Sequence, residues 1–350
     1  MLQIRRYFYL FVALLAALLP LSASAHETYV LSREEVKNGM ADTTVDLFSA
    51  VKNPQNLWLL IEISIAVLVV LIAFFYLQNS QVGRQVDKKL RNWSDLGLLF
   101  VRITLALALF YSALSGSIFG PELALDNLLF APFLPSILFG ISFLLFVGLF
   151  TEVAAFIGLL LFSFAAITYH WYIFLYLHYA GVFVTLILFG SRVLSIDSLL
   201  FGPLERFKDW KNFEQTILRI TYGFALAFAA FYVKLLHPAL TLTVINRYHL
   251  TQFGFLFPSD PVLAVFCAFL AEFSLGLFIL LGFETRLMAL VTLALYTLSL
   301  LFFQEAVWPH FLLYGLSISL LFSNGGRSGI DLILAKKFRR SAKKSADTEI

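Results

Sequence analysis

Cysteine is almost missing from this chain. Its 350 residues contain one, Cys267, which lies inside an apolar run. A single thiol excludes an intrachain disulfide, a CxxC redox pair and a cysteine-based metal site within one chain. We expect Cys267 to pack as a small hydrophobic residue. Any redox role would therefore need a partner protein or a bound cofactor.

Charge is also scarce. Charged residues make up 13% of the chain, hydrophobic residues make up 60%, and 39 residues are phenylalanine. This is too little polar surface to cover a soluble globule, so the composition predicts an all-α integral membrane protein with lipid as its solvent. The net charge is only +3, and outside the C-terminal tail no basic face carries interleaved aromatic residues. This excludes nucleic acid as a partner.

Common catalytic motifs are missing as well. The sequence has no phosphate-binding glycine loop, no serine nucleophile elbow and no HExxH. Serine, histidine and acidic residues are present, but no spacing brings them together. The sequence therefore gives no support for a hydrolase.

The N-terminus has the pattern of a secretory signal peptide. Arg5 and Arg6 precede an apolar stretch at 7–21, and Ala23 and Ala25 form an A-x-A cleavage site. We expect residues 1–25 to be removed, so that the mature chain begins at His26. The alternative is an uncleaved tenth helix.

Apolar runs predict about nine membrane spans, because about 20 helical residues cross ~30 Å of hydrocarbon. A polar periplasmic segment at 26–56 precedes them. The first run is a separate leading helix, and 79–95 is a cytoplasmic loop. The runs are 57–78, 96–116, 134–150, 153–169, 176–191, 217–237, 261–281, 287–304 and 308–323.

The distribution of lysine and arginine predicts the orientation. The expected outer segments contain only four such residues after the signal peptide, whereas the expected inner segments contain sixteen. Positive charge stays in the cytoplasm, so we expect an inner-membrane protein with a periplasmic N-terminus and a basic cytoplasmic tail at 335–350. The outer four are Arg33, Lys37, Lys52 and Arg247.

Polar landmarks recur in order along the two halves of the chain. They predict two tandem four-helix units at 96–200 and 217–334, joined by a cytoplasmic linker at 201–216. Four spans are an even number, so both units have the same orientation, related by an axis near the membrane normal. The landmark pairs are Arg102-Ile103-Thr104 with Arg219-Ile220-Thr221, Gly148-Leu149-Phe150-Thr151 with Gly282-Phe283-Glu284-Thr285, and Gly190-Ser191-Arg192 plus Ile196-Asp197 with Gly326-Arg327 plus Ile330-Asp331.

The spacing of these pairs differs. The last two pairs are 134 residues apart and the first pair is 117 residues apart, so the second unit has about 17 extra residues in its outer loop. That loop and the segment at 26–56 together are candidates for a periplasmic lid or docking surface.

The second unit resembles the DoxX/DoxD family of four-helix membrane proteins. The resemblance is carried by Arg219-Ile220, by the sequence FYVKLLHP at 231–238, by Glu272 with Gly276, by LGFETR at 281–286, by Gly326-Arg327 and by Ile330-Asp331. It implies a membrane subunit, linked in some members to thiosulfate:quinone oxidoreduction or to thiol-oxidative stress complexes. A quinone cofactor and a periplasmic or membrane oxidoreductase partner are therefore expectations.

The first unit departs from this pattern. It has Leu138 where Glu272 aligns, no lysine equivalent to Lys234, and Glu152 in place of Arg286. We expect the first unit to be a scaffold and the second to keep the ancestral role.

Ionisable residues inside the apolar runs are the candidate site, because such groups are costly in hydrocarbon. Glu272 lies about eleven residues into its span, roughly 16 Å deep. Lys234 can reach toward Glu272 or snorkel outward, and Arg219 can pair with Glu284 or Asp331. Either these residues lock a helix bundle, or they line a cavity for a quinone headgroup or small anion that exchanges a proton. The candidate ligand residues are Arg219, Lys234, Glu272 and Arg286.

All six histidines fall on the expected outer side: His26, His170, His178, His237, His249 and His310. A free amine beside the imidazole of His26 would suit copper, but no Cys or Met cluster supports a copper site, so no metal is assigned. Two other functions stay open beside the quinone-linked subunit. They are a small-solute or ion transporter, and a structural anchor without catalysis.

Overall fold

The computed structural model describes residues 31–190, 193–202, 211–254, 257–303, 307–323, 325–326 and 328–334. The expected signal peptide at 1–25, His26 and the expected tail at 335–350 lie outside the described residues. Arg192 and Arg327, which belong to the recurring landmarks, also lie outside them.

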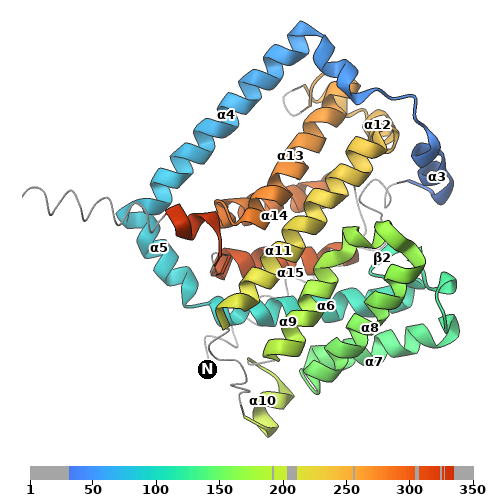
Figure 1. Cartoon of the computed structure of the whole chain (residues 1–350), viewed down its shortest axis with the longest axis vertical. Helices are drawn as coiled ribbons and strands as arrows, with labels where there is room; N and C mark the ends of the chain where they lie inside the picture. Colours follow the sequence, from blue (N-terminus) through green and yellow to red (C-terminus); the bar gives the residue numbers. More distant parts are fainter. Residues whose placement is uncertain are drawn as a thin grey trace, which may run out of the picture.

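The described chain is helical, and many of its helices are apolar (Figure 1). Within it, five helical stretches are long and apolar enough to cross a membrane, which is compatible with a multi-pass membrane protein. Three shorter apolar helices accompany them, at Ala131–Val147, Thr285–Leu300 and Trp308–Ser323. The five long stretches are Pro54–Asn79, Ser94–Ser115, Thr151–Phe189, Phe213–Leu236 and Pro261–Leu281.

The first bundle follows α6 with a short antiparallel hairpin and three further apolar helices. The backbone of His170 has a φ of +50° at the end of α8, and α8 and α9 pack against each other. The continuous stretch Thr151–Phe189 therefore folds back on itself. The elements are α6 Ser94–Ser115, β1 Ser117–Ile118, β2 Gly120–Ala124, η2 Leu125–Asn127, η3 Ala131–Phe133, α7 Leu134–Val147, α8 Thr151–Tyr169, η4 His170–Tyr176, α9 Leu177–Phe189 and α10 Ile196–Leu200.

The connection after the first helix is different in the second bundle. The words inner and outer name the two ends of the bundles by the predicted orientation. Its first helix ends in a π-helical segment, and a helix of ten residues, α12, occupies the outer loop where the sequence predicts extra residues. The elements are α11 Lys211–Ala229, η6 Ala230–Leu236, α12 Pro238–Arg247, η7 Leu250–Gln252, α13 Pro261–Leu281, α14 Thr285–Phe303, η8 Trp308–His310 and α15 Phe311–Ser323. α11 begins inside the segment that the sequence assigns to the linker.

The two bundles pack reciprocally. α6 packs most extensively against α7 and α15, whereas α11 packs most extensively against α13 and α9. The first helix of each bundle thus contacts the second helix of its own bundle and the last helix of the other one.

Two glycines allow this close approach of helices. A Cβ on Gly181 in α9 would lie 1.9 Å from Oγ1 of Thr221 in α11, and a Cβ on Gly315 in α15 would lie 2.0 Å from Oγ1 of Thr104 in α6. Small residues are common where membrane helices cross, since they let the backbones come together. The same glycine and threonine contact therefore occurs at both crossings.

The leading helix, α4 Pro54–Asn79, lies outside both bundles and is followed by α5 Gln81–Arg91 (Figure 1). α5 falls in the stretch 79–95 that the sequence predicts as a loop. On the opposite side of the molecule α3, Arg33–Ala41, packs against α12, and η1, Leu47–Lys52, packs against α13. The described part of the predicted polar segment at 26–56 therefore forms helices that pack against the second bundle.

Candidate intramembrane polar site

Lys234 and Glu272 form an ion pair between η6 and α13. The distance from Lys234 Nζ to Glu272 Oε2 is 3.2 Å. The lysine side chain is only 4% exposed, whereas the glutamate side chain is 42% exposed. Of the two orientations open to Lys234, the structure shows the one that reaches toward Glu272.

The backbone around Lys234 is unusual, since η6 is a seven-residue π-helix. A π-helical turn widens the helix by one residue, and such turns occur frequently at functional sites. Pro238 follows directly and begins α12. Proline cannot donate a backbone hydrogen bond, so the widened turn ends where the chain turns into the outer loop.

Glu272 belongs to the inward face of α13. Gly276 and Ile279 follow it at intervals of four and three residues and are buried, and residues with this spacing share one face of a helix. A residue in the centre of an inward face is normally covered by neighbouring side chains. Glu272 is instead 42% exposed, so part of the carboxylate is left open by the residues around it.

Hydroxyl groups lie close to this ion pair. The phenol of Tyr222 in α11 is fully buried and lies 2.7 Å from Oγ of Ser317 in α15. It also donates a longer hydrogen bond of 3.4 Å to the phenol oxygen of Tyr296 in α14. Glu272 is near enough to Tyr296 for the two to interact electrostatically. Tyr222, Tyr296 and Ser317 thus form one group of hydroxyls, and Glu272 acts on this group through its charge.

Aromatic rings complete this group of residues. The ring of Tyr296 lies 5.5 Å from the imidazole of His310 and 6.0 Å from the ring of Tyr314, measured between centroids. His310 is buried. We call the whole group the Glu272 cluster. It contains Tyr222, Lys234, Glu272, Tyr296, His310, Tyr314 and Ser317.

Sequence reasoning found two members of this cluster and missed the others as ligand candidates. Lys234 and Glu272 stand out because charge is rare in an apolar run. Tyr222, Tyr296 and Ser317 give no comparable signal, since tyrosine and serine are common in membrane helices and nothing in their spacing shows that they meet. Only a fold that brings α11, α14 and α15 together does so.

This arrangement suits a small polar group carried by an apolar molecule. An ammonium, a carboxylate and several hydroxyls converge inside an otherwise apolar bundle, where hydrogen bonds are strong because water does not compete. An ion pair in a medium of low dielectric is also costly unless further hydrogen bonds satisfy it.

Arg219 lies away from this cluster, at the inner end of α11. Its Nη1 donates to the backbone carbonyl of Leu280 at 2.9 Å and to that of Ile279 at 3.4 Å. Leu280 is eight residues beyond Glu272, which is ~12 Å along the helix. Of the two partners expected for Arg219, Asp331 interacts with it electrostatically.

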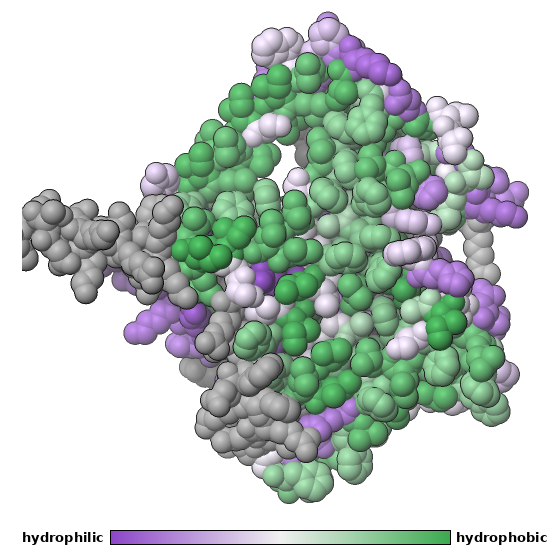
Figure 2. All heavy atoms as spheres, in the orientation of Figure 1, coloured by the Kyte–Doolittle hydropathy of each residue, from purple (hydrophilic) through white to green (hydrophobic). Residues whose placement is uncertain are grey.

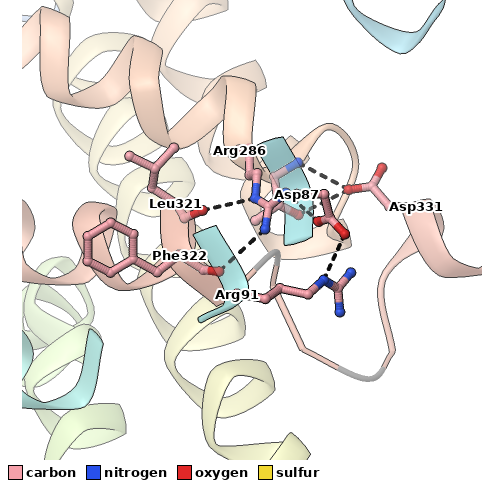
Figure 3. A network of polar contacts seen from close by, with 7 residues as sticks. Asp87, Arg91, Arg286, Leu321, Phe322 and Asp331 are labelled. Carbon is pink, nitrogen blue, oxygen red and sulfur yellow. Dashed lines mark hydrogen bonds and ion pairs between the residues drawn. The ribbon is translucent and has the colours of Figure 1, made fainter. Parts of the chain in front are cut away.

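Arg286 also lies at the inner end and serves a structural contact. Its guanidinium forms an ion pair with Asp87 of α5 and donates to the carbonyls of Leu321 at 2.9 Å and Phe322 at 3.3 Å (Figure 3). Asp87 also pairs with Arg91 at 2.9 Å. The four ligand candidates therefore divide into a pair at the Glu272 cluster and a pair at the inner turn.

The inner turn of each bundle is closed by an aspartate. Asp331 accepts hydrogen bonds from the backbone N–H groups of Glu284 and Thr285 at 2.8 and 3.2 Å, and Asp197 accepts those of Phe150 and Thr151 at 2.8 and 3.0 Å. Each aspartate satisfies donors at the start of a helix that would otherwise be unpaired.

The backbone contacts of these aspartates also correspond. The N–H of Asp197 donates to the carbonyl of Gly148 at 2.9 Å, and that of Asp331 donates to the carbonyl of Gly282 at 3.0 Å. Both glycines have positive φ, at +68°, a conformation that glycine adopts without strain. We call these two arrangements the aspartate clamps.

Glu284 is a buried carboxylate beside the second clamp. Its Oε1 accepts a hydrogen bond of 2.7 Å from Nε2 of Gln78 at the end of α4, and its Oε2 has no hydrogen-bond partner within the part of the chain that the structure describes. Burial, and to a lesser extent the charge of Asp331, raises the pKa of Glu284 to about 8.

No group of three or more His, Cys, Asp or Glu residues that could hold a metal ion occurs in the described part of the chain. His178 and His310 are buried, and they lie in different bundles.

No family model, no curated protein and no solved structure matches this chain.

Proposed function

We propose that this chain is an inner-membrane subunit of DoxX type, with one leading helix and two tandem four-helix units giving nine spans. The second unit binds the polar headgroup of a membrane-soluble molecule, a quinone, at the Glu272 cluster. A periplasmic or membrane oxidoreductase partner supplies the electrons, and Glu272 exchanges a proton with the bound headgroup. The mature N-terminus is periplasmic and the C-terminus is cytoplasmic.

The observation that carries this proposal is the state of Glu272. It lies on the same face of α13 as the buried residues Gly276 and Ile279, pairs with a buried lysine, and yet remains 42% exposed. A pair that only locked helices together would be covered on all sides, because an accessible charge inside the bilayer is costly. The open side of the carboxylate is where a headgroup binds.

Internal duplication is supported by contacts that occur twice. The two aspartate clamps have the same hydrogen bonds, and each glycine and threonine crossing has its counterpart in the other unit. With the spacing of 117 residues for the first helix and 134 for the others, Thr104 aligns with Thr221 and Gly181 aligns with Gly315. Independent contacts at aligned positions are the pattern expected from two copies of one unit.

The same alignment shows that the first unit is filled where the second is polar. The positions of Tyr222, Glu272, Tyr296 and Ser317 correspond to apolar residues, which are all buried. Those four residues are Leu105, Leu138, Phe162 and Phe183.

A phenylalanine from the outer hairpin closes the first unit further. Phe119 is buried, and its ring centroid lies 4.7 Å from that of Tyr179 and 5.5 Å from that of Phe162. In the second unit the outer connection instead runs through η6 and α12. This difference supports a scaffold role for the first unit and a binding role for the second.

The test is the quinone content of the purified full-length protein. We expect quinone to co-purify in mild detergent at close to one molecule per chain, and Glu272→Gln or Lys234→Met to reduce it at least tenfold, because each removes one side of the ion pair. Glu62→Gln is the matched control, since Glu62 is also a carboxylate in an apolar helix but lies on exposed α4. The control should keep the wild-type quinone content.

Two results would count against a quinone site. One is purified protein without quinone that also fails to bind a short-chain quinone analogue. The other is equal loss of quinone in Glu62→Gln and Glu272→Gln, which would indicate a general effect of charge on lipid content.

A transporter is the second candidate, favoured by the row of hydroxyls that continues from Glu272 through Tyr296 and Tyr222 to Ser317. Hydroxyls in a row can replace water as hydrogen-bond partners of a small solute or ion, and so form a path for it. Proteoliposomes distinguish the two functions, since only a transporter would show solute or proton flux that Glu272→Gln abolishes. Unchanged flux and no bound quinone would leave the structural-anchor function.

A further inference from the structure

The leading helix α4 is apolar around its whole circumference and almost uncovered. In α4, which the structure describes from end to end, Asn56 is the only buried residue. Its apolar side chains are exposed on every side, including Trp58, Ile65 and Val69. A helix of this kind must be covered by lipid or by another apolar chain.

Polar contacts fasten α4 at its two ends. At one end the amide of Asn56 donates to the carbonyl of Ala50 at 2.9 Å and to Oδ2 of Asp260, before α13, at 2.8 Å. At the other end Gln78 donates to Glu284. Over the length between these contacts the helix stands away from the second bundle.

The space between α4 and the second bundle is open. Figure 2 shows a hollow between α4 and α13, bordered by hydrophobic side chains on both sides. We call it the α4 window. The second bundle also has exposed apolar residues, among them Leu290, Val291 and Leu295 of α14. Apolar walls of this kind suit acyl chains rather than water.

Cations gather on α5, directly after the inner end of α4. Arg84, Lys88, Lys89 and Arg91 are all exposed. The one acidic residue of α5, Asp87, is already neutralised by Arg286 and Arg91. α5 therefore has an excess of unpaired positive charge.

α5 also has an apolar stripe. Val82, Val86 and Leu90 recur every four residues on one face, and the two valines are 63% and 50% exposed. A helix with an exposed apolar stripe and a basic face lies in the plane of the membrane interface, where its cations meet anionic headgroups.

We propose that the α4 window and α5 form a binding site for an anionic phospholipid. Its acyl chains lie between α4 and α13, and its phosphate group contacts the cations of α5. The charge of α5 selects an anionic headgroup over a zwitterionic one, and the fastened ends of α4 retain the lipid against exchange. This site is separate from the Glu272 cluster and does not depend on quinone binding.

The test measures lipid retained by the full-length protein. Protein purified in mild detergent is washed with excess detergent, then mixed with equal amounts of phosphatidylglycerol and phosphatidylcholine and analysed by native mass spectrometry. We expect one or two retained phosphatidylglycerol molecules per chain. Lys88→Gln with Lys89→Gln should reduce the preference for phosphatidylglycerol about 30-fold, at roughly fivefold for each cation near an anionic surface.

The matched control is Lys37→Gln with Lys52→Gln, which removes the same charge from the opposite side of the molecule. It should leave the preference unchanged. A second variant, Val67→Trp, adds bulk on the face of α4 that also carries Asn56 and Gln78, and it does not change the charge. It should reduce total retained lipid while the protein keeps its wild-type melting temperature.

Equal retention of the two lipids by the wild-type protein would overturn the proposal. So would equal losses in the α5 variant and the control, because bulk attraction to the membrane would then explain the preference. Unchanged retention in Val67→Trp would overturn the placement of the acyl chains in the α4 window.

Discussion

At the scale of single residues, two ionisable groups inside the apolar helices are buried and are held by specific partners. Lys234 is paired with Glu272, and Arg219 is held by backbone carbonyls. Glu284 is less completely satisfied, because its Oε2 has no hydrogen-bond partner among the described residues. An unpaired buried carboxylate favours its neutral form, so this residue should make stability depend on pH.

Glu284→Gln should remove that dependence. The pKa of Glu284 is raised from 4.5 to about 8 in the folded protein, so its contribution is fully favourable below pH 4.5 and is lost as the pH rises through 8. We expect the wild-type melting temperature in detergent to fall between pH 6 and pH 9, and the variant to be more stable at pH 9 by roughly 1–3 kcal/mol.

The matched control for this measurement is Glu35→Gln. Hydrogen bonds from Ser32, followed by the charge of Arg247, lower the pKa of Glu35. Its stabilising contribution is therefore lost only as the pH falls below 4.5, and Glu35→Gln should leave the wild-type pH dependence between pH 6 and pH 9 unchanged. A wild-type melting curve that is flat between pH 6 and pH 9 would show that Glu284 is ionised in the folded protein.

At the scale of elements, the clamps explain why each inner turn has the sequence that it has. A glycine with positive φ reverses the chain, and an aspartate from a later segment satisfies the N–H groups at the start of the next helix. The two parts are far apart in sequence, at Gly282 and Asp331 in the second bundle. Two of the recurring landmarks, the glycine turn and the later aspartate, are therefore the two partners of one contact.

Asp197→Asn and Asp331→Asn should destabilise the protein by similar amounts. An asparagine oxygen can replace one of the two accepting oxygens but brings two N–H donors and no charge, so each change should cost roughly 1–3 kcal/mol. Melting temperatures of both variants in detergent provide the measurement. A neutral effect in one of them would show that the clamps are not equivalent, which would weaken the case for duplication.

Much of the helical framework is predictable from apolar runs. The predicted run at 261–281 coincides with α13, and the run at 57–78 lies within α4. The polar helices were missed, since α5 falls in a predicted loop and the start of α11 falls in a predicted linker. Hydropathy indicates whether a segment prefers lipid or water, but it does not indicate backbone conformation. A polar helix therefore has no hydropathy signal.

The candidate site was predictable only in part. A charge in an apolar run identifies Glu272 and Lys234, but Arg219 and Arg286 give the same signal and belong to the inner turn. The two pairs differ in their position along the helix. That position is known only once the first residue of each helix is known. The π-helical turn at η6 has no sequence signature of its own, because it depends on how the helix packs.

At the scale of the whole molecule, the distribution of lysine and arginine predicts one orientation in the membrane. Reporter fusions test it. A reporter joined after residue 334 should be active only in the cytoplasm, and one inserted at Asp42, after α3, should be active only in the periplasm. Periplasmic activity at the C-terminal fusion would reverse the orientation and place the basic face of α5 on the outer leaflet.

The reciprocal contacts of α6 with α15 and of α11 with α9 have a consequence for the origin of the chain. If one four-helix unit associates with an identical copy, its first helix meets the last helix of its twin, which is the arrangement of a symmetric dimer. Covalent fusion of such a dimer releases the two copies from having the same sequence. One copy can then fill its interior with leucine and phenylalanine and carry the burden of stability, while the other remains free to keep an open, charged interior.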